Sequence, residues 1–339
     1  MKYRVTVLTP TLVGNGDKLS PIDYMVWRDQ VNVLDQPRIF RLLSKGPRLE
    51  GYLTQLHKAT KLDFASWGGF AQNYADRRIP FEDTAYTPYW ERAQAESLSI
   101  PTFAAAHDGP FLPGTAIKGA LRTAFAFANQ KPSGSGGSDR MRVISVADSG
   151  PRSRDPFRVY MLRLSTLIAK GPQQYSLAWK QSGRGAVDGK RPEEGTPAFA
   201  EMADPGTAFE GAWRENQFLN GEEVRQALRW SAPVTRERLF EAANSYAAKQ
   251  LELHAQYAGW TGLAGLAAAV AELQAKLAAM RSEGGCLLSI GWGAGLLSKS
   301  AVIETDAMKS GLPFPKTRRV VFLKNKPATL PGWVELRVE

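Results

Sequence analysis

The sequence is nearly devoid of cysteine and poor in histidine. With Cys286 as its single cysteine, the chain can form no internal disulfide and no cysteine-based zinc site of its own. Its three histidines, His57, His107 and His254, share no spacing typical of metal ligands. We therefore predict no metal and no cofactor, and we expect the reducing environment of the cytoplasm.

Long apolar runs and familiar catalytic motifs are absent as well. No run of about 18 apolar residues occurs, which predicts that the chain does not span a membrane. The short apolar run after the first basic residues lacks a cleavage site, so export is not expected. The sequence contains no G-x-S-x-G, no H-E-x-x-H and no Cys–His pair at a recognisable spacing. No catalytic residue is predicted.

The sequence has fewer acidic than basic residues. The 33 Asp and Glu residues stand against 43 Lys and Arg residues, which gives a formal net charge of +10 and a pI of about 9.6. A basic surface attracts polyanions through the release of counterions, so nucleic acid is the leading partner class. An acidic protein partner would satisfy the same charge.

Strand-like and helix-like segments alternate without a strict βαβ order. Strands are expected at 3–8, 24–34, 142–147, 158–164, 207–213, 286–291, 318–323 and 333–338. Helices are expected at 115–128, 222–231, 235–257 and 261–280. This order predicts an α+β fold in which helices cover one face of antiparallel sheets. The length of 339 residues favours two domains.

The segment 8–24, LTPTLVGNGDKLSPIDY, is the first candidate for phosphate contact. Gly14 and Gly16 would let the backbone approach a phosphate closely, and Lys18 adds a positive charge. It is not a Walker loop, because no Gly-Lys-Ser/Thr follows at the required spacing. A plain turn between strands explains the glycines equally well.

The segment 111–125, FLPGTAIKGALRTAF, is the second candidate. Its Pro-Gly turn leads into a helix with Thr115 as the expected N-cap, and free N–H groups at such an end attract anions. Lys118 and Arg122 are four residues apart and share a helix face, which suits a phosphate clamp. The alternative is an ordinary solvated helix face.

The segment 289–300, SIGWGAGLLSKS, is the third candidate. Gly291, Gly293 and Gly295 leave backbone amides accessible, Trp292 offers a plane for base stacking, and Lys299 adds charge. The spacing differs from G-x-G-x-x-G, so dinucleotide binding is not expected.

The segment 314–326, FPKTRRVVFLKNK, holds five basic residues and no acid. Strand alternation would place Arg318 and Arg319 on opposite faces. The segment is either a strip that follows a nucleic-acid backbone or an edge strand protected by charge.

Taken in this order, the segments resemble the RAMP superfamily of CRISPR-associated proteins, and within it the family of the fifth Csm subunit of type III-A effector complexes. The resemblance runs nearly end to end, except for 172–281. The stretches on which it depends are LTPTLVGNGDKLSPIDYMV, FLPGTAIKGALRTAF, VADSG, GWGAGLLSKS, FPKTRRVV and GWVEL.

The resemblance implies two RRM-like (ferredoxin-like) modules with insertions, at 1–165 and at 166–339, the second with a helical insertion and the glycine-rich loop. It also implies a non-catalytic subunit that binds the guide RNA toward its 3′ end, caps the stack of backbone subunits and supports guide maturation. The implied partners are the guide RNA, the other Csm backbone subunits and an adjacent target RNA. The predicted RNA-binding residues are Gly14, Gly16, Lys18, Lys118, Arg122, Gly291, Trp292, Gly293, Gly295, Lys299, Arg318 and Arg319.

Several alternatives stay open. The chain resembles type III-B subunits as well, and a purely structural cap without RNA contact is conceivable. A guide-processing endoribonuclease would use a histidine or tyrosine near the glycine-rich loop, whereas the three histidines lie far from 291–295 in the sequence. Sister backbone subunits cut target RNA with an aspartate in a loop after the first strand, and Asp23 has a comparable place. Cleavage there would need a divalent metal, and a turn aspartate is the simpler explanation.

Overall fold

The computed structural model describes residues 1–58, 73–93, 97–129, 139–171, 174–182, 186–303 and 315–339. Within these residues the strands of every sheet pair antiparallel, and helices pack against the sheets, so the predicted α+β class is confirmed. The helices are α1 (Gln36–Leu43), α2 (Leu49–Lys58), α4 (Tyr86–Arg92), α5 (Gly114–Asn129), α6 (Glu222–Ala227), α7 (Arg236–Thr261) and α8 (Ala264–Ser282). No helix in this part of the chain is long and apolar enough to cross a bilayer.

The first sheet has the strand order β14-β17-β1-β13-β9. Its strands are β1 (Lys2–Val7), β9 (Ile144–Val146), β13 (Ala208–Glu215), β14 (Cys286–Ser289) and β17 (Trp333–Val338). Along the chain, β1, α5, β9, β13, α7 and β17 follow one another as strand, helix, strand, strand, helix, strand. That succession, with β1 between β17 and β13, is the ferredoxin-like arrangement, and β14 extends it by one strand.

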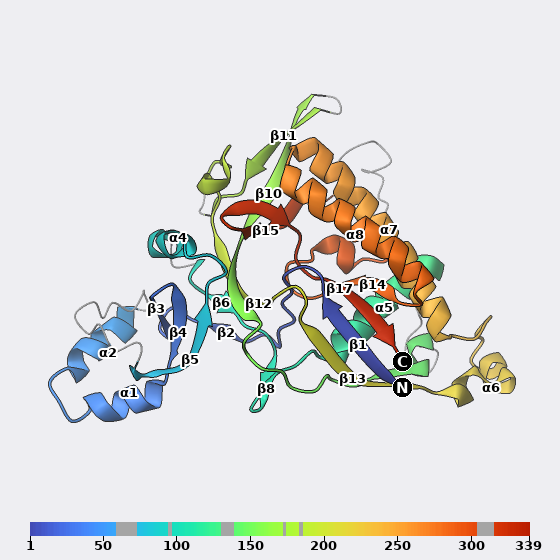
Figure 1. The fold of residues 1–339 in the computed structure, drawn as a ribbon, viewed down its shortest axis with the longest axis horizontal. Helices are drawn as coiled ribbons and strands as arrows, with labels where there is room; N and C mark the ends of the chain where they lie inside the picture. The colour runs from blue at the N-terminus through green and yellow to red at the C-terminus, as the bar shows by residue number, and fades with distance from the viewer. Residues whose placement is uncertain (59–72, 94–96, 130–138, 172–173, 183–185, 304–314) are drawn as a thin grey trace.

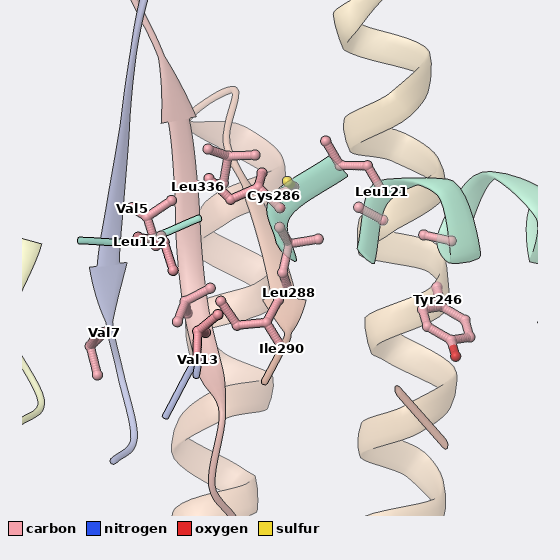
Figure 2. Close-up of a cluster of buried hydrophobic side chains, with 14 of the residues drawn as sticks. Val5, Val7, Val13, Leu112, Leu121, Tyr246, Cys286, Leu288, Ile290 and Leu336 are labelled. Atoms are coloured by element: carbon pink, nitrogen blue, oxygen red, sulfur yellow. The ribbon is translucent and has the colours of Figure 1, made fainter. Parts of the chain in front are cut away.

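The core of this module lies between the first sheet and the helices α5 and α7. Alternation in KYRVTV turns Tyr3, Val5 and Val7 of β1 inward and leaves the residues between them more exposed. Leu121 of α5 and Tyr246 of α7 belong to the same buried cluster (Figure 2). The two helices thus cover one face of the sheet.

The ends of α7 follow from local chemistry. The hydroxyl of Thr235 accepts a hydrogen bond from the N–H of Arg238 at 3.4 Å, as expected of an N-cap. Gly262 ends the helix in the left-handed conformation, with φ of 67°. The chain then enters α8, which lies beside α7 (Figure 1). The predicted apolar period of α8 is confirmed, because its buried residues are Leu266, Val270, Leu273, Leu277 and Met280.

The second sheet is built around one long strand. Its members are β10 (Phe157–Gly171), β11 (Gln174–Trp179), β12 (Ala198–Ala203), β15 (Thr317–Leu323) and β16 (Lys326–Thr329). β11 and β12 pair with successive parts of one edge of β10, and β15 pairs with the other edge. α8 packs against β16.

A smaller unit at the left of Figure 1 projects from the two large sheets. It contains α1, α2 and a three-stranded sheet of β3 (Tyr24–Trp27), β4 (Gln30–Leu34) and β5 (Ala75–Pro80). The remaining short strands pair as β2 (Lys18–Leu19) with β6 (Ile100–Pro101) and as β7 (Ala105–Ala106) with β8 (Gly109–Pro110). An ion pair between Arg77 of β5 and the buried Glu201 of β12 ties this unit to the second sheet.

The two modules are interleaved along the chain. Residue 165, the end of the first predicted module, lies inside β10, and the first sheet contains strands from both sides of it. β1, near the N-terminus, pairs with β13 and β17, and β10 pairs with β15. Sequence order alone therefore does not separate the modules.

Candidate nucleic-acid interface

Three of the four predicted segments meet at one groove of about 960 Å³. One side is formed by the segment from Leu12 to Lys18 and by the start of the glycine-rich loop, Gly291 and Trp292. Arg319 of β15 and Lys299 also line it. The groove thus collects Gly14, Gly16, Lys18, Gly291, Trp292, Lys299 and Arg319 of the predicted residues.

The glycine-rich loop is seated against the N-terminal segment by its backbone. Trp292 donates its N–H to the carbonyl oxygen of Leu12 at 2.8 Å. Gly291 has a φ of 80°, and a Cβ at this position would overlap that same carbonyl oxygen. Only glycine allows both the left-handed backbone and the close approach. Residues 279 positions apart in the numbering are joined here.

Trp292 and Arg319 form a stacked pair in the groove. The guanidinium carbon of Arg319 lies 4.1 Å from the centroid of the Trp292 ring. Burial lowers the pKa of Arg319 from its ordinary value. Among the described residues Arg319 has no acidic partner, so its charge is available to a ligand while the indole holds it in place.

Two further basic residues that line the groove, Lys18 and Lys299, are exposed lysines. In the described ranges, Lys18 and Lys299 are exposed and have no acidic partner. Asp17 is the one acid that lines the groove in this part of the chain. Such groups attract phosphates without reading base identity.

Lys118 and Arg122 do not line the groove, and both have partners within the chain. The Lys118 ammonium donates to the carbonyl oxygen of Ile144 at 2.8 Å, on the edge strand β9. Arg122 forms an ion pair with Asp139 at 2.6 Å. Burial first, and then the charge of Arg122, lower the pKa of Lys118. Both cations therefore bind partners within the chain, near the edge strand β9 of the first sheet.

The N-terminus of α5 is also occupied from within the chain. Helix α5 begins at Gly114, one residue before its expected N-cap Thr115. The carboxylate of Asp148 accepts a hydrogen bond from the Gly114 N–H at 2.8 Å. The protein thus supplies its own anion where an external one was predicted.

Arg318 and Arg319 lie on opposite faces of β15, as strand alternation predicted, but Arg318 turns inward. It is 7% exposed, and its guanidinium lies 4.7 Å from the Tyr257 ring centroid of α7. Its Nε donates to His254 Nδ1 at 3.1 Å. Arg318 is therefore absent from the lining of the groove. With Gly293 and Gly295, it lines a second, smaller pocket beside it. Phe314, the first residue of the predicted basic segment, lies outside the described residues.

The position of Asp23 fits a turn rather than a catalytic site. Its carboxylate accepts hydrogen bonds from the N–H and the hydroxyl of Ser20, both at 2.6 Å. It does not line the groove. Within the part of the chain that the structure describes, no three His, Cys, Asp or Glu side chains gather as metal ligands.

The rest of the groove's lining was not foreseen. It comes from β10, from the start of β12 and from residues 180–182, through Leu162, Leu164, Lys180 and Phe199 among others. Lys180 pairs with Asp188 at 2.7 Å. Leu164 is 37% exposed within a mostly buried strand. Its exposure depends on how β11 and β15 pair with β10, which the local sequence does not predict. The position of His254 was also not predicted. It is distant from Gly293 in the sequence, and only the fold brings the two residues to one pocket.

Comparisons with known proteins agree with the resemblance found in the sequence. Residues 4–168 match the model of the RAMP superfamily. A chain of the cryo-EM structure of a Csm–crRNA–target RNA ternary complex in a type III-A CRISPR-Cas system is similar, with a TM-score of 0.68, 18% identity, and coverage of 99% of this chain and 100% of that chain. The crystal structure of Csm5 from T. onnurineus gives a TM-score of 0.65 at 18% identity, with coverage of 98% and 99%. No curated protein sequence matches. The predicted fold is thereby confirmed, and the match over residues 4–168 agrees with the predicted resemblance to the RAMP superfamily.

Proposed function

We propose that this chain is an RNA-binding subunit of a type III-A Csm complex. Its residues 4–168 match the RAMP superfamily, and its fold is that of Csm5. In this proposal it binds the guide RNA toward its 3′ end, caps the stack of backbone subunits and supports guide maturation. Its partners are the other Csm subunits in the cytoplasm, with the target RNA adjacent. It acts by binding and not by cleavage.

The observation that supports this proposal is the groove lined by the segment 12–18, the glycine-rich loop and strands of the second sheet. Lys18, Lys299 and the stacked Trp292–Arg319 pair face a space of about 960 Å³. A guide-binding surface must accept any spacer sequence. Phosphate contacts and base stacking do this, whereas hydrogen bonds to base edges would select a sequence.

The test is affinity purification of the tagged protein from its host, followed by sequencing of the copurified RNA and identification of the proteins. We expect short RNAs that share a repeat-derived 5′ handle, together with the other Csm subunits. Copurified type III-B subunits would assign the chain to that system instead. Protein free of such RNA would overturn the proposal.

One observation favours a second candidate, a guide-processing endoribonuclease. The fold brings His254 to the pocket that contains Gly293 and Gly295, although these residues are distant in the sequence. Burial and the charge of Arg318 hold the pKa of His254 well below its usual range, which leaves a neutral imidazole. Incubation of the isolated protein with repeat RNA decides the matter, since cleavage within the repeat would establish the enzyme.

A further inference from the structure

A second pocket of about 390 Å³ lies beside the groove. The two spaces share Leu164, Trp292, Lys299 and Arg319, so the Trp292–Arg319 pair forms part of the wall of each. The volume is within the range of about 300–1,000 Å³ that is usual for small-molecule sites. The pocket is therefore large enough for a ligand of its own.

Two nearly buried side chains that line this pocket have nitrogen atoms without a hydrogen-bond partner in the described residues. Arg318 is 7% exposed and His254 is 3% exposed. Arg318 uses Nε on His254 and Nη1 on the carbonyl oxygens of Pro315 and Thr317. Among the described residues, neither Nη2 of Arg318 nor Nε2 of His254 has a protein partner, and neither atom is sealed from solvent. Both atoms are therefore free to donate a hydrogen bond to a ligand in the pocket.

The hydrogen bond between the two residues fixes which nitrogen of His254 holds the hydrogen. An arginine Nε always donates, so His254 Nδ1 must accept. A neutral imidazole then has its hydrogen on Nε2, which makes that atom a donor. Arg318 Nη2 and His254 Nε2 therefore both present hydrogens.

The rest of the lining adds positive charge and no negative charge. Lys299 and Arg319 are at the side shared with the groove, and none of the described residues that line the pocket is Asp or Glu. The loop residues Gly293 and Gly295 have φ of 90° and 85°, and their backbone N–H groups make no hydrogen bond within the described chain. A lining of donors and cations without acids selects an anion.

We propose that this pocket binds a phosphate group, supplied by a mononucleotide or by an RNA chain, with Arg318 and His254 as its inner donors. This site is separate from the groove and does not depend on the identity of the guide RNA. A tetrahedral phosphate offers several acceptor oxygens, which matches donors that arrive from α7, from β15 and from the glycine-rich loop. Lys299 neutralises the remaining charge from the entrance.

The histidines provide a direct probe. His57 and His107 are exposed, and His254 alone lies in this pocket. In the full-length protein with labelled histidine, we expect inorganic phosphate to shift the His254 NMR signals in a saturable manner and to leave the other two in place. Adenosine monophosphate should produce the same shift, and adenosine should not.

Two variants test the assignment. Arg318→Met should weaken phosphate binding by about tenfold or more, because a charged hydrogen bond is lost. Lys299→Ala changes an exposed side chain, leaves the fold intact, and should weaken binding about fivefold. Lys45→Ala, an exposed lysine on the projecting unit, is the charge-matched control and should bind as the wild type does. Thermal melting verifies that each variant is folded.

The source of the phosphate is resolved with RNA of one sequence in three forms, with a 3′-phosphate, with a 3′-hydroxyl, and circular. A stronger His254 shift with the 3′-phosphate identifies a chain end, and equal shifts identify the phosphodiester backbone. Absence of any His254 response to phosphate would overturn the proposal, as would an unchanged affinity in both Lys299→Ala and Arg318→Met. Neither result bears on copurification of guide RNA, so failure here is distinguishable from failure of the proposed function.

Discussion

Neutralising Lys18 and Lys299 together tests whether the groove follows an RNA backbone. Both side chains are exposed, line the groove and have no acidic partner in the described chain. Each phosphate contact on single-stranded nucleic acid contributes about 0.7 to the slope of log K against log salt concentration. The double variant Lys18→Ala/Lys299→Ala should therefore flatten the slope by about 1.4. Taking 1 M salt as the point where the ionic contribution vanishes, the loss of affinity is about 25-fold at 0.1 M salt and about fivefold at 0.3 M.

The assay is fluorescence anisotropy of a labelled single-stranded RNA of about 20 nucleotides at several KCl concentrations. The matched control is Lys45→Ala/Lys58→Ala, which removes two exposed lysines of the projecting unit and should leave both slope and affinity unchanged. If the slope of the groove variant equals that of the wild type, the two lysines do not contact phosphates. If the control loses as much affinity as the groove variant, only net charge matters and the groove has no special role.

Three further predictions concern stability. Gly295→Ala should lower the free energy of unfolding by about 1 kcal/mol from backbone strain. Gly291→Ala should lower the free energy of unfolding at least twice as much, because its Cβ also overlaps the Leu12 carbonyl oxygen. Equal losses for the two variants in urea unfolding would contradict this packing. Arg77→Met leaves the buried Glu201 carboxylate without its ion pair and should lower the free energy of unfolding by about 3–5 kcal/mol. Adding Glu201→Met should recover most of this loss. A double variant no more stable than Arg77→Met alone would refute this prediction. The pKa of His254 is lowered in the fold, so below about pH 6.5 the unfolded chain binds a proton that the folded chain does not. Stability should then fall by up to about 1.4 kcal/mol per pH unit as the pH drops below 6.5, and His254→Gln should remove this contribution; a constant difference between variant and wild type from pH 5 to 7.5 would contradict it.

Local pattern was sufficient for much of the fold. Apolar spacing located α8, and alternation separated Arg318 from Arg319. Alternation could not tell which of the two arginines faces outward. That depends on α7, whose Tyr257 covers the face of β15 that bears Arg318. A neighbour more than fifty residues away in sequence therefore decided which of the two cations lines the groove.

The partners of the basic residues on α5 also depend on packing. Lys118 and Arg122 share a helix face, and the spacing correctly predicts that they lie together. Whether that face meets solvent or a sheet edge is a property of the packed molecule. Here Lys118 meets the carbonyl oxygen of Ile144, and Asp148 fills the helix end. The rest of the groove's lining escaped prediction because β10, β12 and residues 180–182 come together with the predicted segments only in the packed molecule.

The central position of β1 has a consequence for biosynthesis. Its neighbours in the sheet are β13, about 200 residues later, and β17, more than 320 residues later. Contacts so distant in sequence cost loop-closure entropy before they contribute stability, so this module should be among the last parts of the chain to fold. While residues 333–338 are still within the ribosome, one long edge of β1 is unpaired and the loop of Gly291 has no completed sheet behind it. Until residues 333–338 have left the ribosome, the nascent chain therefore lacks the complete first sheet from which the loop of Gly291 extends.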